Sequence, residues 1–121
     1  MILKVLIGVF LFIVILLKTQ HLIRVTGDSM SPNYVDGEVL FATSFFRAKN
    51  LKAGDVMIYR PPITSHEEVE FVIKRIHHVF EDPHGNLFFY FIGDNSEVSF
   101  DSRRYGYVPK NRLVAKVIKK I

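Results

Sequence analysis

The stretch Phe71-Val72-Ile73-Lys74-Arg75-Ile76 is apolar except for two adjacent cations. In a β-strand, alternate side chains point to opposite faces, so Lys74 shares a face with Val72 and Ile76. The neighbouring Arg75 then points the other way, toward solvent or a carboxylate. Two interpretations of Lys74 remain open: a buried amine that acts as a base, or an edge-strand lysine that discourages aggregation.

Strand signals continue on both sides of this stretch. The Asp-Pro-His-Gly-Asn turn at 82–86 predicts a hairpin between a long strand at 69–80 and a partner at 87–92. No 3.6-residue periodicity is sustained after residue 24, so few helices are expected beyond the N-terminus. Residues 64–68 are predicted to form a mobile loop. The fold class is therefore mainly β, with further strands expected at 38–43, 55–59 and 113–121.

The N-terminus carries an uninterrupted apolar run at residues 5–17, between Lys4 and Lys18. A membrane span needs about 17–25 residues, so this run spans only if both lysines snorkel. A cleavable signal peptide is the alternative, but residues 16–20 lack the small-x-small cleavage pattern. We therefore expect a membrane anchor at 1–20 and a β domain at 21–121. Basic residues on both sides leave the orientation undecided.

Composition narrows the possible chemistry. A chain of 121 residues has room for one domain, and the absence of Cys excludes disulfides, thiolate metal sites and a Cys nucleophile. The net charge of +4 is scattered along the chain. It suits a surface near anionic lipid, and no nucleic-acid partner is expected.

The segment Gly27-Asp28-Ser29-Met30-Ser31-Pro32 predicts a sharp turn that can expose the Ser29 hydroxyl. A purely structural turn explains the same residues. With Lys74, however, the chain offers a nucleophile and a base, which is a known alternative to Ser-His-Asp chemistry. The base must be neutral near pH 7, which requires its pKa to fall by roughly two to three units from about 10.4.

A third polar segment, residues 93–103, follows the strand predicted at 87–92. It is either a surface loop or part of a site, in which Ser99 can bond the Lys74 amine and Asp101 can pair with Arg103. The adjacent His77 and His78 invite a metal hypothesis. Neighbouring strand residues face opposite sides, so we expect them not to share an ion and predict no metal site.

These three segments, in this order, resemble the conserved boxes of the type I signal peptidase family, which are membrane-bound Ser-Lys endopeptidases. The resemblance covers residue 22 nearly to the end and implies a signal-peptidase-like antiparallel β domain behind an N-terminal transmembrane helix. It implies Ser29 as nucleophile and as backbone oxyanion donor, Lys74 as base, and Ser99 as the residue that orients the lysine. The residues implied as structural support of the site are Gly27, Met30, Asp94, Asp101 and Arg103.

Some features depart from the family pattern. Gly27 stands where some members carry a hydroxyl that supplies a second oxyanion donor. Gly37-Glu38 replaces the commoner Gly-Asp, the Pro-Gly-Asp stretch after the base box is absent, and the large second domain is missing. The chain therefore resembles a minimal member of the family.

The expected function is removal of signal or presequences from translocated preproteins, without a cofactor. The expected location is the cell membrane, with a single span and the catalytic domain on the outer side. A maturation peptidase with one substrate and a catalytically silent, membrane-tethered β binding module are the alternatives. Self-cleaving repressors share the dyad but carry a DNA-binding domain, whereas here only the apolar segment precedes Ser29. The sequence leaves the oligomeric state open.

Overall fold

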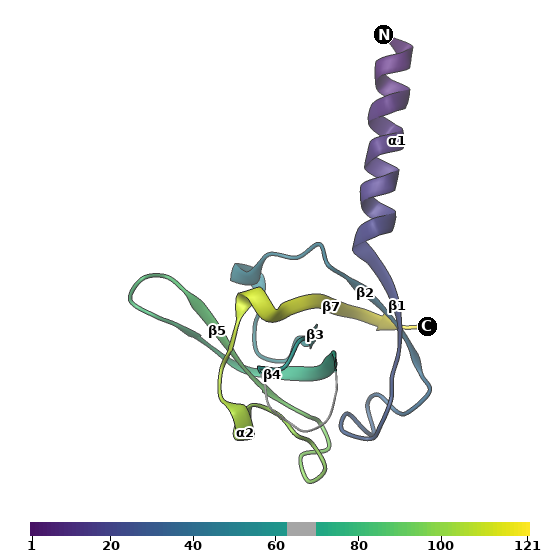
Figure 1. Cartoon of the computed structure of the whole chain (residues 1–121). Helices are drawn as coiled ribbons and strands as arrows, with labels where there is room; N and C mark the ends of the chain where they lie inside the picture. The colour runs from purple at the N-terminus through teal and green to yellow at the C-terminus, as the bar shows by residue number, and fades with distance from the viewer. Residues whose placement is uncertain (63–69) are drawn as a thin grey trace.

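A computed structural model describes residues 1–62 and 70–121 of the chain. The loop expected at 64–68 and the first residue of the strand expected at 69–80 lie outside the described residues. Within the described part, one long helix stands clear of a β domain (Figure 1).

The helix α1 (Ile2–Thr19) has no buried residue and a mean hydropathy of 2.6, so it is long and apolar enough to cross a membrane. Lys18 lies in its last turn. Strand β1 (Gln20–Arg24) begins at the next residue, without an intervening loop. The division into an anchor at 1–20 and a catalytic domain at 21–121 remains a prediction, although the helix ends beside that boundary.

The described strands form one antiparallel sheet in the order β1-β2-β7-β3-β4-β5-β6. This confirms the mainly β fold, the hairpin and the strands expected from the sequence, with shifts of a few residues at their ends. Beyond β1, their bounds are β2 (Val39–Thr43), β3 (Val56–Tyr59), β4 (Val72–Glu81), β5 (Leu87–Ile92), β6 (Val108–Pro109) and β7 (Leu113–Lys120).

Several elements were not expected from the sequence. Strand β1 and the two-residue β6 extend the sheet at its two edges. The short helix α2 (Ser102–Tyr105) and two 3₁₀ turns, η1 (Ala48–Asn50) and η2 (Lys110–Arg112), shape the connections. They are too short to show a periodic pattern of apolar residues.

Two apolar clusters pack on the sheet. One gathers buried side chains around Leu40 and Ile58, and it includes Met30 from the turn after β1. The other is aromatic, with Tyr59 stacked on Phe91 at 4.1 Å between ring centroids. Strand β4 runs between β3 and β5 in the interior of the sheet, so the edge-strand interpretation of Lys74 is wrong.

Candidate active site

Ser29 lies in a local turn within the long connection between β1 and β2. Gly27 adopts a φ of +85°, a left-handed conformation that side chains other than glycine rarely tolerate. Its N–H donates to the Asp36 carboxylate at 2.8 Å, and the N–H of Ser31 donates to the Asp28 carbonyl at 3.1 Å. The Met30 side chain is fully buried in the first cluster. The turn is therefore fixed to the core one residue after Ser29.

Lys74 reaches this turn from the middle of the sheet. Its Nζ lies 2.6 Å from the Ser29 Oγ, across 45 residues of sequence. The lysine is only 5% exposed, and its strand neighbours pair with β3 and β5. The structure therefore brings together the two residues that the sequence suggested as nucleophile and base.

Both groups border one cleft of about 220 Å³. Its walls come from the end of β1, from the turn that carries Ser29, and from the start of β4. The lining residues are Ile23, Arg24, Val25, Thr26, Ser29, Ile58, Phe71, Val72, Ile73 and Lys74. The hydroxyl and the amine are thus buried on one side and border an open space on the other.

Burial lowers the pKa of the Lys74 amine, because a charged ammonium loses its hydration in the apolar interior. The negative charge of Asp101 acts in the opposite direction and raises that pKa. Burial is the larger of the two effects. The environment therefore shifts the Lys74 amine toward its neutral form, the form that a general base requires.

Asp101 is completely buried and forms the centre of a second group of polar residues. It accepts hydrogen bonds from the Gly93 N–H at 2.9 Å and from the Ser99 hydroxyl at 2.7 Å, and it pairs with Arg103 at 2.9 Å. Burial alone raises the pKa of Asp101, but these bonds overcome that effect and lower the pKa to about 2. The carboxylate is therefore charged at any physiological pH.

The position of Ser99 differs from the expectation. Within the described residues, its hydroxyl donates to Asp101, and the expected hydrogen bond to the Lys74 amine is not formed. A serine hydroxyl has one hydrogen to donate, and the ionised Asp101 carboxylate is a stronger acceptor for it than a neutral amine. Ser99 thus contacts the carboxylate whose charge acts on Lys74.

The segment that follows β5 holds the serine turn in place. The N–H of Asn95 donates to the Ser29 carbonyl at 2.9 Å, and the N–H of Asp94 approaches the Met30 sulfur at 3.4 Å. Gly93 is closely packed here. A Cβ on Gly93 would lie 2.2 Å from the Ser99 Oγ and 2.7 Å from the Ser29 carbonyl oxygen. The sequence marked Gly93 as the first residue of the polar segment 93–103 but did not predict its packing against the serine turn.

On the opposite face of β4, Arg75 meets a carboxylate, as strand alternation indicated. Two nitrogens of its guanidinium each lie 2.8 Å from an oxygen of Asp94, and a third donates to the Gly54 carbonyl at 2.8 Å. The hydrogen bonds from Arg75 hold the pKa of Asp94 below its usual range. Asp94 also accepts a bond from Asn33 at 2.9 Å. This arrangement ties β4 to the serine turn.

The second oxyanion donor cannot come from Gly27 in this conformation. Gly27 has no side chain, and its N–H already donates to Asp36.

The prediction that His77 and His78 face opposite sides is wrong. The register of β4 against β5 shifts between Ile76 and His78, so His77 is an extra residue in a bulge. Their Nδ1 atoms lie 2.8 Å apart, and His78 stacks on Tyr90. Over residues 1–62 and 70–121, no group of three His, Asp or Glu side chains is placed to hold a metal ion.

A serine hydroxyl bonded to a buried lysine beside an open cleft is an arrangement of serine hydrolases that use an amine as the base. The chain belongs to the signal peptidase family: the family model "Signal peptidase, peptidase S26" matches residues 1–79 and 80–120. Membership supports serine peptidase activity at the level of the family. A comparison with curated proteins finds no match.

Proposed function

We propose that this protein is a membrane-anchored serine endopeptidase that removes N-terminal signal or presequences from translocated proteins. The observation that carries the proposal is the 2.6 Å contact between Lys74 Nζ and Ser29 Oγ, on a lysine that the sheet buries. The family match supports the same activity independently.

In the proposed mechanism, the Ser29 Oγ attacks the scissile carbonyl while the neutral Lys74 amine takes the hydroxyl proton. The ammonium of Lys74 then gives this proton to the leaving amine as the peptide bond breaks. Water hydrolyses the resulting acyl-enzyme, with Lys74 again as the base. The N–H of Ser29 is proposed as an oxyanion donor.

Asp101 is proposed as a positioning residue rather than a reacting one. Its charge favours the ammonium that forms when Lys74 accepts the proton, while burial favours the neutral amine before that step. Ser99 and Arg103 keep the Asp101 carboxylate ionised and fixed. On the other side of the turn, Asp94 holds the serine segment through Arg75 and Asn33.

The proposed substrate is an extended segment that adds as a strand in the cleft. The backbone of β1, at one edge of the sheet, and the start of β4 border this cleft. A volume of about 220 Å³ suits small side chains next to the cut bond. Helix α1 would hold the enzyme in the membrane, with the β domain on the outer side, where translocated preproteins emerge.

The test is cleavage of a panel of presequence peptides by the full-length protein in detergent. We expect Ser29→Ala and Lys74→Ala each to lose activity by about four orders of magnitude or more. Ser31→Ala, two residues further along the same turn, should retain it. Cleavage of many peptides would indicate a general signal peptidase, and cleavage of one a dedicated maturation enzyme.

Wild-type protein that cleaves none of the panel, or variants as active as wild type, would contradict the proposal. The chain would then be better described as a membrane-tethered β module that binds its partner without reaction.

A further inference from the structure

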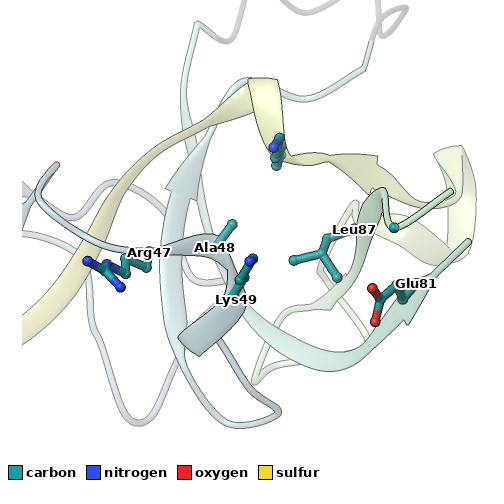
Figure 2. A pocket seen from close by; sticks show the side chains of 7 residues that line it. Arg47, Ala48, Lys49, Glu81 and Leu87 are labelled. Atoms are coloured by element: carbon teal, nitrogen blue, oxygen red, sulfur yellow. The ribbon is translucent and has the colours of Figure 1, made fainter.

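A second pocket lies between η1, the turn of the β4–β5 hairpin and η2 (Figure 2). Its volume is about 690 Å³, and it shares no lining residue with the cleft at Ser29. The residues that line it are Arg47, Ala48, Lys49, Glu81, Gly85, Leu87 and Lys110.

The charge of this pocket is mainly positive. Arg47, Lys49 and Lys110 are all exposed, and a single carboxylate, Glu81, faces them. None of the ion pairs found within residues 1–62 and 70–121 involves these three cations. In Figure 2, Lys49 extends toward Leu87 across the opening, and Arg47 lies at the outer rim. The pocket therefore suits an anion that has an apolar part.

The cations are carried on a fixed backbone. In η1, the N–H of Asn50 donates to the Arg47 carbonyl at 3.0 Å, and the N–H of Leu51 donates to the Ala48 carbonyl at 3.2 Å. Leu51 is buried in the aromatic cluster, and Phe46 packs against it. Little backbone freedom is lost when a ligand binds to such a preformed site.

The segment between β2 and η1 starts next to the end of α1. The Ser44 N–H donates to the Thr19 carbonyl at 2.7 Å, and the Ser44 hydroxyl lies 2.6 Å from His21 Nε2. The next residue, Phe45, is 80% exposed. In Figure 1, η1 and the end of α1 lie along the same border of the β domain, with α2 at the opposite border.

We infer that the pocket of Arg47, Lys49 and Lys110 binds the phosphate headgroups of anionic phospholipids, with Phe45 entering the bilayer interface beside it. Basic and aromatic side chains next to a membrane helix suit the interface between water and lipid. The basic side chains bind the charged headgroups, and the aromatic ring contacts the acyl chains. The inference rests on the anchoring of α1 in a membrane, which is part of the proposed function. It adds a second attachment that holds the β domain against the lipid surface.

The first experiment uses tryptophan as a reporter, because the chain contains none. Three full-length variants, Phe10→Trp, Phe45→Trp and Phe100→Trp, are placed in nanodiscs that contain brominated lipid as a quencher. Phe10 lies within α1, and Phe100 is 48% exposed beside α2. We expect strong quenching at position 10, clear quenching at position 45 and none at position 100.

The second experiment tests the charge. Each Lys or Arg near an anionic leaflet strengthens membrane association about fivefold. Quenching at position 45 should therefore rise when phosphatidylglycerol replaces part of the phosphatidylcholine. Replacing Arg47, Lys49 and Lys110 together with Gln should weaken the docked state about a hundredfold. The matched Arg104→Gln variant, at the border that carries α2, should leave docking unchanged.

Several outcomes would overturn the inference. Quenching at position 45 that ignores lipid charge, or that survives loss of the three cations, would remove the headgroup site. If soluble glycerol phosphate, added at the same concentration, competes with the lipid and abolishes quenching at position 45, the pocket binds a free phosphate instead. If an acidic peptide does so, the pocket binds a protein partner. An unquenched position 10 would instead refute the anchoring of α1. Peptide cleavage by Ser29 in detergent is scored separately, so failure of the lipid site is distinguishable from failure of the peptidase.

Discussion

Two neighbouring cations on β4, Lys74 and Arg75, lie on opposite faces of the strand in different environments. Arg75 is a third exposed and meets Asp94 through two hydrogen bonds, so its charge is compensated. Lys74 is nearly inaccessible, and its amine contacts the hydroxyl of Ser29. Burial lowers the pKa of the Lys74 amine and so favours the neutral form that a general base requires, whereas the paired Arg75 stays charged and serves as a structural tie. One strand thus carries both the proposed base and the arginine that holds the serine turn through Asp94.

The strongest test of this difference replaces Lys74 by Met, which keeps the volume and removes the charge. Activity on a presequence peptide should fall by about four orders of magnitude or more. Stability should rise near neutral pH. The folded-state pKa of Lys74 lies below its unfolded value, so the unfolded chain binds the proton more tightly and folding is less favourable at neutral pH. This loss of folding free energy disappears only as the pH rises toward 10.5. Denaturant unfolding at pH 7 and at pH 10 measures it, and a loss of stability at pH 7 would contradict a strained ammonium.

A second test concerns Gly93, which follows β5 and packs against Ser99 and the serine turn. In Gly93→Ala the new Cβ would press on the Ser29 carbonyl and on Ser99, at 2.7 Å and 2.2 Å from their oxygens. We expect a loss of about 3 kcal/mol in the free energy of unfolding, together with reduced kcat. The same substitution at Gly8, where a Cβ meets nothing within 4 Å, is the control for thermal unfolding. Equal stability of the two variants would mean that the turn gives way easily.

Arg75→Met, the counterpart of the lysine variant, should act in the opposite direction. It leaves the largely buried Asp94 without its main partner, so the free energy of unfolding should fall by about 2 kcal/mol. Activity should fall much less than in Lys74→Met, because Arg75 does not touch the reacting atoms. The double variant Arg75→Met with Asp94→Asn should recover part of the lost free energy of unfolding. An Arg75→Met protein that is stable but fully inactive would contradict the view that Arg75 acts on stability and Lys74 on activity.

The smallest effect is expected in the pH profile. The charge of Asp101 raises the pKa of Lys74, so Asp101→Asn should move the acidic limb of kcat/KM to lower pH. Asp94→Asn removes a carboxylate that does not act on Lys74 in this way, and its limb should stay in place. If the acidic limb of kcat/KM shifts in both variants, or in neither, Asp101 has no specific effect on Lys74 and is not a positioning residue.

The sequence was sufficient where information is local. β-branched and aromatic runs bounded by glycine turns predicted the strands, and alternation along β4 correctly separated Lys74 from Arg75. Strand β1 was missed because Gln20-His21-Leu22-Ile23-Arg24 has polar ends and continues directly from the helix. A pair of apolar residues just after a long apolar helix does not show the alternation that would indicate a separate strand.

The site itself depended on long-range packing. The sequence suggested Ser29 and Lys74 as a pair, but only the sheet register brings them to 2.6 Å. The bulge at His77 and the choice of Asp101 by Ser99 depend on neighbouring strands and on buried charge. Strand alternation assumes an uninterrupted ladder, so it failed at the one place in β4 where the ladder gains a residue.

The direct passage from Thr19 to Gln20 has a mechanical consequence. If α1 spans the bilayer as proposed, a β domain joined to it without a linker is held at a fixed distance from the lipid surface. The height of Ser29 above the lipid is then set by the shape of the protein. A preprotein held in the same bilayer would have to present its scissile bond at that height, so the enzyme would measure its substrate as well as cut it.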